Sequence, residues 1–177
     1  MAYIPIGWRI GGLILGGAGL LTGVSAIAAS SLTGYAGAMQ EVRKIDQAAI
    51  NFAVSDMMHD ALNGDVLSAR LIGTSALSEQ RAIEADLAAH AQLFQDKLAA
   101  NKALGLSKEI RSKFEAVDGD LNAYIEAARA AVETAFSGNA SLGAFAAFDQ
   151  AFETLETRND AVRAELEAGA DAIEREA

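Results

Sequence analysis

The chain has 177 residues, a length typical of one domain, and its formal net charge of −10 argues against nucleic-acid binding, which requires clustered lysine and arginine. The absence of cysteine excludes disulfide scaffolds, cysteine-based zinc sites and thiol nucleophiles. One proline, 6% aromatic residues and a hydrophobic fraction of 51% that is largely alanine favour long helices over a β-sandwich.

The first predicted element is a transmembrane helix over residues 10–37. Residues 10–40 contain no charged side chain, and this run exceeds the roughly 20 apolar residues that are needed to cross a bilayer. Elsewhere apolar residues alternate with charged ones, so no second segment is a candidate. Two G-x-x-x-G spacings, Gly12/Gly16 and Gly19/Gly23, either let two helices approach closely or reflect the abundance of small residues in such helices.

The flanks of this segment predict its topology. Arg9 precedes it and charges of both signs follow it, so the positive-inside rule hardly favours either orientation of the span. The short terminus over residues 1–9 and the large acidic part after the span favour a cytoplasmic N-terminus and an external domain over residues 38–177. A cleaved signal peptide is the alternative, because residues 26–28 read A-x-A. The apolar run continues to Met39, however, which favours an uncleaved anchor.

Beyond Met39 the sequence predicts four long amphipathic helices, the first of them continuous with the span. Their ranges are 38–72, 77–104, 107–137 and 141–177. Each break between them combines a glycine suited to a helix C-terminus with a serine or threonine suited to cap the next helix. The breaks lie at residues 73–75, 105–107 and 138–141.

Apolar residues recur in these helices at alternating spacings of three and four, which is typical of the seam of a left-handed bundle. The third and fourth helices show the clearest seams, which are Ile110, Phe114, Val117, Leu121, Tyr124, Ala128, Ala131 and Ala135, and Phe145, Phe148, Phe152, Leu155, Asn159, Val162, Leu166, Gly169 and Ile173. The first two helices contribute Ile45, Ala48, Phe52, Ser55, His59, Leu62, Val66 and Ala69, and Ile83, Leu87, Ala91, Phe94 and Leu98. Short loops make consecutive helices antiparallel. We therefore predict an all-α fold, an antiparallel up-down-up-down four-helix bundle whose first helix is continuous with an N-terminal transmembrane helix.

Polar residues interrupt the seams at similar heights. At 1.5 Å per residue, His59, Tyr124 and Asn159 fall within about two turns of one another, with His90 at the edge of the same layer. Such a buried polar layer either fixes helix register and oligomer state or contacts a ligand or metal. Asp60 follows His59 directly and so points away from it, and no H-E-x-x-H or Glu-x-x-His pair is present, so we predict no metal site.

The sequence contains no catalytic constellation. It has no G-x-S-x-G motif and no phosphate-binding glycine loop after a strand, and its carboxylates lie at the spacing of solvated helix faces. We therefore predict neither an enzyme nor a cofactor.

Four arginines are candidate ligand-binding residues. Arg70 and Arg81 lie close to the turn between the first two helices, Arg129 lies in an alanine-rich stretch, and Arg158 adjoins Asn159. An arginine on an otherwise apolar face can bind a carboxylate through its two-pronged donor geometry. The alternative for each is an ordinary surface arginine.

Taken together, these features resemble the sensor half of bacterial methyl-accepting chemotaxis receptors. The segment DMMHDALNGDVL over residues 56–67 carries most of the resemblance, and the ending LEAGADAIEREA over residues 166–177 is similar to a last helix before a second span. The resemblance implies a periplasmic four-helix domain anchored by a single span in the inner membrane. It also implies a homodimer or higher homo-oligomer that binds an organic acid or an amino acid near the membrane-distal tip.

The resemblance is incomplete in two respects. Family sites often use arginines from the first and fourth helices, but residues 142–152 contain no arginine, so Arg81 would have to replace one beside Arg70. Such receptors also continue into a second span and a cytoplasmic signalling region, which the 177 residues do not include, as in a receptor fragment or a short protein derived from a receptor. The alternative function is a structural or assembly protein that oligomerises or docks on a membrane complex through its helices.

Overall fold

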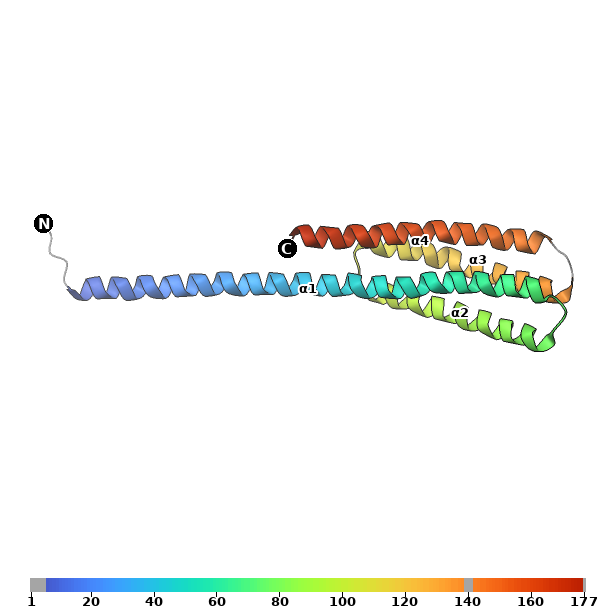
Figure 1. Ribbon diagram of the computed structural model, residues 1–177. Helices are drawn as coiled ribbons and strands as arrows, with labels where there is room; N and C mark the ends of the chain where they lie inside the picture. The colour runs from blue at the N-terminus through green and yellow to red at the C-terminus, as the bar shows by residue number, and fades with distance from the viewer. Residues whose placement is uncertain (1–5, 139–141, 177) are drawn as a thin grey trace. The chain divides into compact units, whose positions relative to one another are not determined.

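The computed structural model describes the backbone of residues 6–138 and 142–176, and side chains from residue 35 onward except at 139–141, 174, 176 and 177. The fold is all-α, as predicted, with four helices: α1 (Ile6–Ile72), α2 (Leu77–Ala103), α3 (Lys108–Ser137) and α4 (Leu142–Glu176) (Figure 1). No β-strand occurs among the residues with a described backbone. The predicted helix bounds agree with these to within a residue or so after Met39.

The predicted glycines end the helices. Gly73, Gly105 and Gly138 have φ values of 51°, 64° and 68°, the left-handed conformation that only glycine adopts without strain. Of the predicted caps at residues 73–75 and 105–107, one is confirmed and one is wrong. The Ser107 side chain caps α3 by accepting from the Ile110 amide at 3.2 Å. Ser75 does not cap α2; its hydroxyl donates back to the Ile72 carbonyl at 2.6 Å.

The described chain divides into two compact units, the part of α1 up to Glu41 and the range Val42–Glu176. Within the described part, no helix combines the length and the apolar character that crossing a membrane requires. The predicted span over residues 10–37, with its Gly12/Gly16 and Gly19/Gly23 spacings and the A-x-A alternative, falls largely outside the residues whose side chains are described. So does the predicted cytoplasmic terminus over residues 1–9.

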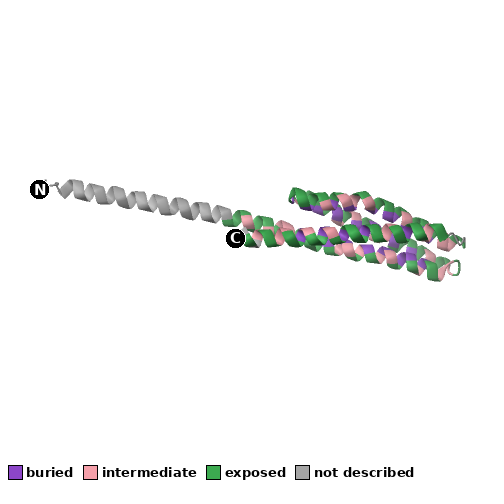
Figure 2. Cartoon of the chain, turned by 90° about the horizontal axis from the view of Figure 1, so that it is seen from above, coloured by how far each residue is buried: buried purple, intermediate pink, exposed green. Residues whose placement is uncertain are grey.

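The second unit has one hydrophobic core to which all four helices contribute. Buried residues recur along each helix (Figure 2), and the largest fully buried side chains include Tyr124, Phe94, Phe114 and Phe148. The predicted seams are buried almost throughout. The half-buried seam positions are Ile45, Ala135, Phe145, Phe152, Gly169 and Ile173, and the first four of these pack against the core. Gly169 is a seam position where α4 lies close to its neighbours, because a Cβ atom there would lie 3.0 Å from Ile110 Cδ1.

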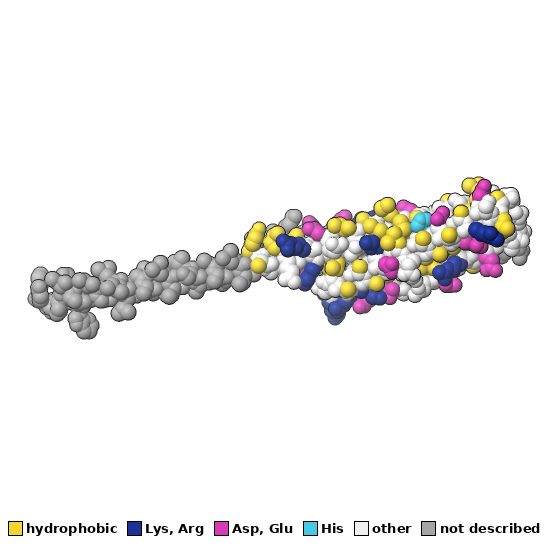
Figure 3. Space-filling view, turned by 90° about the horizontal axis from the view of Figure 1, so that it is seen from below, with side chains coloured by type: hydrophobic (Ala, Val, Ile, Leu, Met, Phe, Trp, Pro, Cys, Tyr) yellow, Lys and Arg dark blue, Asp and Glu magenta, His cyan; other side chains and the backbone are white. Residues whose placement is uncertain are grey.

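Polar contacts join the helices of this unit in pairs. Asp56 of α1 accepts from Asn159 and Arg163 of α4, and Lys102 of α2 pairs with Asp118 of α3 at 2.7 Å. The exposed surface is mixed in charge. Figure 3 shows one face of the molecule, on which acidic, basic and apolar side chains are interspersed.

Candidate functional site

The predicted polar layer is buried. His59 and Tyr124 are 0% exposed and Asn159 is 1% exposed. The Tyr124 hydroxyl donates to the backbone carbonyl of His59 at 2.9 Å, which ties α3 to one turn of α1. Burial raises the pKa of Tyr124, so its phenol stays protonated and remains a donor.

The His59 ring lies between aromatic side chains. It stacks on Phe152 of α4 with centroids 4.3 Å apart and an interplanar angle of 14°, and its centroid is 5.1 Å from that of Tyr124. Neither ring nitrogen has a hydrogen-bond partner among the described residues, although Nδ1 is 3.3 Å from Oε2 of Glu156. Burial lowers the pKa of His59 below 6.5, and nearby carboxylates oppose that shift without reversing it. The ring is therefore neutral near pH 7.

Asn159 contacts Asp56 of α1. Its amide donates to Asp56 at 3.2 Å, one turn before His59 along α1, while its own carbonyl oxygen has no hydrogen-bond partner in the described structure. Arg163 donates to the other carboxylate oxygen of Asp56 at 3.0 Å. Asp56 therefore connects two residues of α4 to α1, and the polar layer extends from His59 toward the surface.

His90 lies apart from this layer. Its Nδ1 is 2.8 Å from a carboxylate oxygen of Asp65 on α1. Burial raises the pKa of Asp65, and the contact with His90 partly offsets that effect. The sequence did not predict Asp65 as a buried residue.

A second buried network was missed by the sequence reasoning. Asn51 of α1 donates to Asn101 of α2 at 2.9 Å, and the Asn101 amide also donates to the Ala48 carbonyl at 3.2 Å. Asn51 is 5% exposed and Asn101 is 1% exposed. The spacing of the α2 seam contained a signal for Asn101, because Asn101 lies three residues after the seam residue Leu98. The network fixes the register of α1 against α2.

The four predicted arginines do not converge. Arg129 pairs with Glu126 on its own helix at 2.8 Å, and Arg158 of α4 pairs with Asp120 of α3 at 2.8 Å. The Arg70 guanidinium lies 4.6 Å from the ring centroid of Phe145, a cation–π contact between α1 and α4. Arg81 is exposed, and no carboxylate within the described residues pairs with Arg81 or Arg70.

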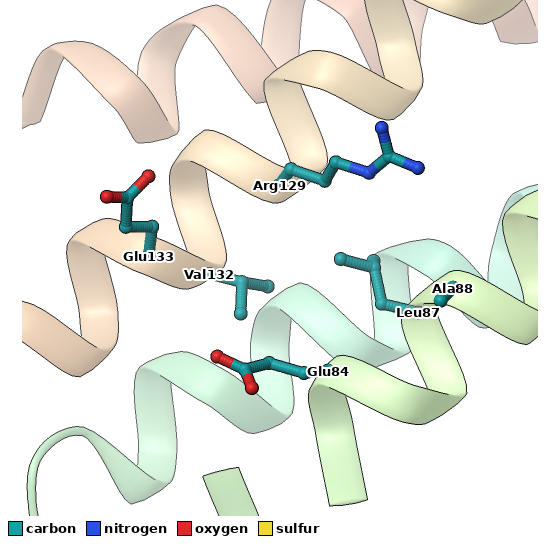
Figure 4. Close-up of a pocket in the computed structure, with 6 residues that line it drawn as sticks. All are labelled: Glu84, Leu87, Ala88, Arg129, Val132 and Glu133. Atoms are coloured by element: carbon teal, nitrogen blue, oxygen red, sulfur yellow. The ribbon is translucent and has the colours of Figure 1, made fainter. Parts of the chain in front are cut away.

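An open groove of about 390 Å³ lies between α2 and α3. The side chains that line it are Glu84, Leu87, Ala88, Arg129, Val132 and Glu133. The close-up shows the Arg129 guanidinium pointing away from the carboxylates of Glu84 and Glu133 (Figure 4). Two carboxylates and one guanidinium line this groove, so its lining has a net negative charge, which disfavours an anionic ligand.

No three metal-binding side chains gather anywhere in the described ranges. The arrangement at His59, Tyr124 and Asn159 therefore offers contacts between helices and one titratable imidazole, whereas Arg70 and Arg81 offer charge at the turn between α1 and α2.

No protein-family model, curated protein or solved structure matches the chain.

Proposed function

We propose that the chain is a membrane-anchored sensory input domain, a binding module rather than an enzyme. The observation that carries this proposal lies in α1, a single helix that contains both the uncharged residues 10–40 and the seam of the four-helix unit. A helix of that composition supports a single-pass anchor over residues 10–37 in contact with membrane lipid. We place the domain in the periplasm because the resemblance to chemotaxis receptors implies it.

We infer that the four helices form an antiparallel up-down-up-down bundle. The contacts between α1 and α4 support this, because the α4 residue numbers fall as those of α1 rise: Asp56 contacts Arg163, His59 contacts Phe152, and Arg70 contacts Phe145. The same relation holds for α1 and α2, where Asn51 contacts Asn101 and Asp65 contacts His90.

An exposed apolar stripe on α1 supports a homodimer or higher homo-oligomer. Ile50, Met57 and Leu71 are 59%, 64% and 88% exposed and recur at multiples of seven residues, so they lie on one face of the helix. Leu67, one turn before Leu71, is 47% exposed on the same side. A second copy would bury this stripe. The stripe also favours the second candidate function, a structural protein that assembles through its helices.

The ligand we propose is a small organic acid or amino acid bound at the turn between α1 and α2. Arg129 and Arg158 already have carboxylate partners, which leaves Arg70 and Arg81 as the candidates for a carboxylate ligand. A guanidinium that stacks on Phe145 keeps its edge free for bidentate hydrogen bonds.

The anchor leads to a direct prediction. The full chain is expected to sediment with membranes and to resist extraction by high salt, whereas a variant that lacks residues 10–37 is expected in the soluble fraction with a strongly helical circular dichroism spectrum. Replacement of Leu13 and Leu15 by alanine is the control, because this keeps the run uncharged and should leave the chain in the membrane fraction. Recovery of the full chain in the soluble fraction would contradict the anchor.

The ligand site is tested by a thermal-shift screen of the full chain with succinate, malate, aspartate and glutamate. A charge-assisted hydrogen bond contributes about 1.5–3 kcal/mol, so Arg70→Ala and Arg81→Ala are each expected to weaken binding of a hit about tenfold or more. Arg129→Ala is the matched control and should bind normally. If both tip variants bind a hit as well as the parent, the site lies elsewhere; if none of the four compounds stabilises the protein, the assembly function is favoured.

A further inference from the structure

His59 contacts two other helices through different parts of its structure. Its backbone carbonyl accepts from Tyr124 of α3, and its ring stacks on Phe152 of α4. The backbone contact does not depend on the ionisation of the imidazole, whereas the ring contact does. One residue thus has a fixed attachment to α3 and an attachment to α4 that a proton can change.

The ring is buried without compensation for its polarity. It is 0% exposed, and both nitrogens are without hydrogen bonds from the described residues. Burial of a neutral imidazole costs less free energy than burial of a charged one. A protonated ring needs acceptors or water for two N–H groups. In its present position a protonated ring would have the carboxylate of Glu156 3.3 Å from Nδ1 and the backbone of Phe152 in its favour, while its burial would still disfavour the charge.

The charged groups around His59 determine where a protonated ring would go. From α1, Asp56 and Asp60 contribute negative charge, and Asp56 is already held by Asn159 and Arg163. From α3 the facing group is the neutral phenol of Tyr124. From α4 it is Glu156, whose carboxylate is 3.3 Å from Nδ1 and whose side chain is 49% exposed. Glu156 thus offers both an acceptor and a route to water.

We propose that His59 is a proton-operated switch at the contact between α1 and α4. The neutral ring holds α4 through its stack on Phe152. Protonation pairs the ring with Glu156 at the surface and loosens the packing of the two helices around Phe152. The switch requires neither the membrane anchor nor a ligand, so it can hold or fail independently of the proposed function.

The direction of the pH dependence follows from the lowered pKa of His59 in the folded protein. The unfolded chain, with an ordinary histidine pKa of 6.5, binds more protons than the folded one below that pH. The stability associated with the buried neutral ring is therefore present above pH 6.5 and is lost as the pH falls through the folded-state pKa.

The test uses the full-length chain and carbon-detected or proton–carbon NMR of the imidazole rings from about pH 8 down to about pH 5. His59 and His90 are the two histidines of the chain, so a His90→Gln variant assigns both signals. We expect the His59 signal to titrate with a midpoint below 6.5. Amide hydrogen exchange around His59 and Phe152, corrected for its intrinsic pH dependence, should rise as that signal titrates.

Two variants separate the switch from general acid sensitivity. His59→Leu should remove the change in exchange around Phe152 over this pH range. Glu156→Gln should lower the His59 midpoint further, because the carboxylate of Glu156 favours the protonated ring. Glu153→Gln, another exposed carboxylate on α4, is the matched control and should leave the midpoint nearly unchanged. A His59 midpoint at or above 6.5, or an exchange response that persists in His59→Leu, would overturn the proposal. If His59→Leu does not fold, the titrations of the parent and Glu156→Gln decide the question.

Discussion

Replacement of Phe148 by alanine is expected to lower the free energy of unfolding by about 3–5 kcal/mol, the cost of a large cavity in a close-packed core. Phe148 is 2% exposed, and its ring stacks on Tyr124 of α3 with centroids 5.4 Å apart. Loss of the ring therefore removes contacts between α3 and α4 as well as buried apolar area. Urea unfolding followed by circular dichroism measures the change.

The control for Phe148 is an apolar residue on the same helix that buries little. Leu142 is 82% exposed, so Leu142→Ala should change the free energy of unfolding by no more than about 0.5 kcal/mol. If Phe148→Ala cost less than Leu142→Ala, α4 could not be packed against α3 as described.

The second large effect is expected at the Asn51–Asn101 contact. Asn101→Leu leaves the buried amide of Asn51 without its acceptor and removes the bond to the Ala48 carbonyl, and an unsatisfied buried polar group costs about 1–3 kcal/mol. Asn51→Leu should be destabilising for the same reason. The double variant replaces both polar groups by apolar ones of similar size, and it should be close to neutral.

A double-mutant cycle measures this coupling. The sum of the two single losses should exceed the loss in the double variant by about 1 kcal/mol or more. Asn122 is the matched control because it is exposed, and Asn122→Leu should be nearly neutral alone and additive with Asn51→Leu. Simple additivity of Asn51→Leu and Asn101→Leu would show that the two side chains do not depend on each other.

The seams were predictable because burial on one face of a helix leaves a spacing of three and four residues in the sequence. Phe114, Leu121 and Leu155 are buried where that spacing places them. The turn glycines were predictable as well, because the left-handed conformation selects glycine at the end of a helix. Both features are local, so they follow from short stretches of sequence.

Asn51 and Asp65 form a second buried stripe on α1, and its burial was not predictable in the same way. Asn51 and Asp65 are adjacent to the seam residues Phe52 and Val66, and they are separated by two heptads, with the half-buried Met58 between them. A helix that contacts two neighbours buries a wider face, but polar residues on that face look like solvent-exposed ones in a sequence. Their burial depends on the partners His90 and Asn101, which only the tertiary structure identifies.

The arginine candidates show the same limitation. The sequence placed Arg70, Arg81, Arg129 and Arg158 correctly on their helices, but it could not say which of them had acidic partners. The partner of Arg158 is 38 residues away on α3, and that of Arg129 is three residues away on its own helix. The partner of Arg158 is settled by packing, whereas the pair of Arg129 with Glu126 lies at a spacing that the sequence already contains.

The sequence separation of the helix contacts has a consequence for the order of folding. The salt bridge between α2 and α3 joins residues 16 positions apart, whereas the bond between Asp56 and Asn159 joins residues 103 positions apart. Because closing a long loop costs more chain entropy than closing a short one, the α2–α3 and α3–α4 hairpins are expected to form early and the α1–α4 contact last. The same contact should then be among the first to part when the protein is pulled or partly denatured. The helices would separate first at the α1–α4 contact, which includes His59. Probes on α1 and α4 at this contact would report the slow step of folding, and probes within the α2–α3 hairpin would report the fast one.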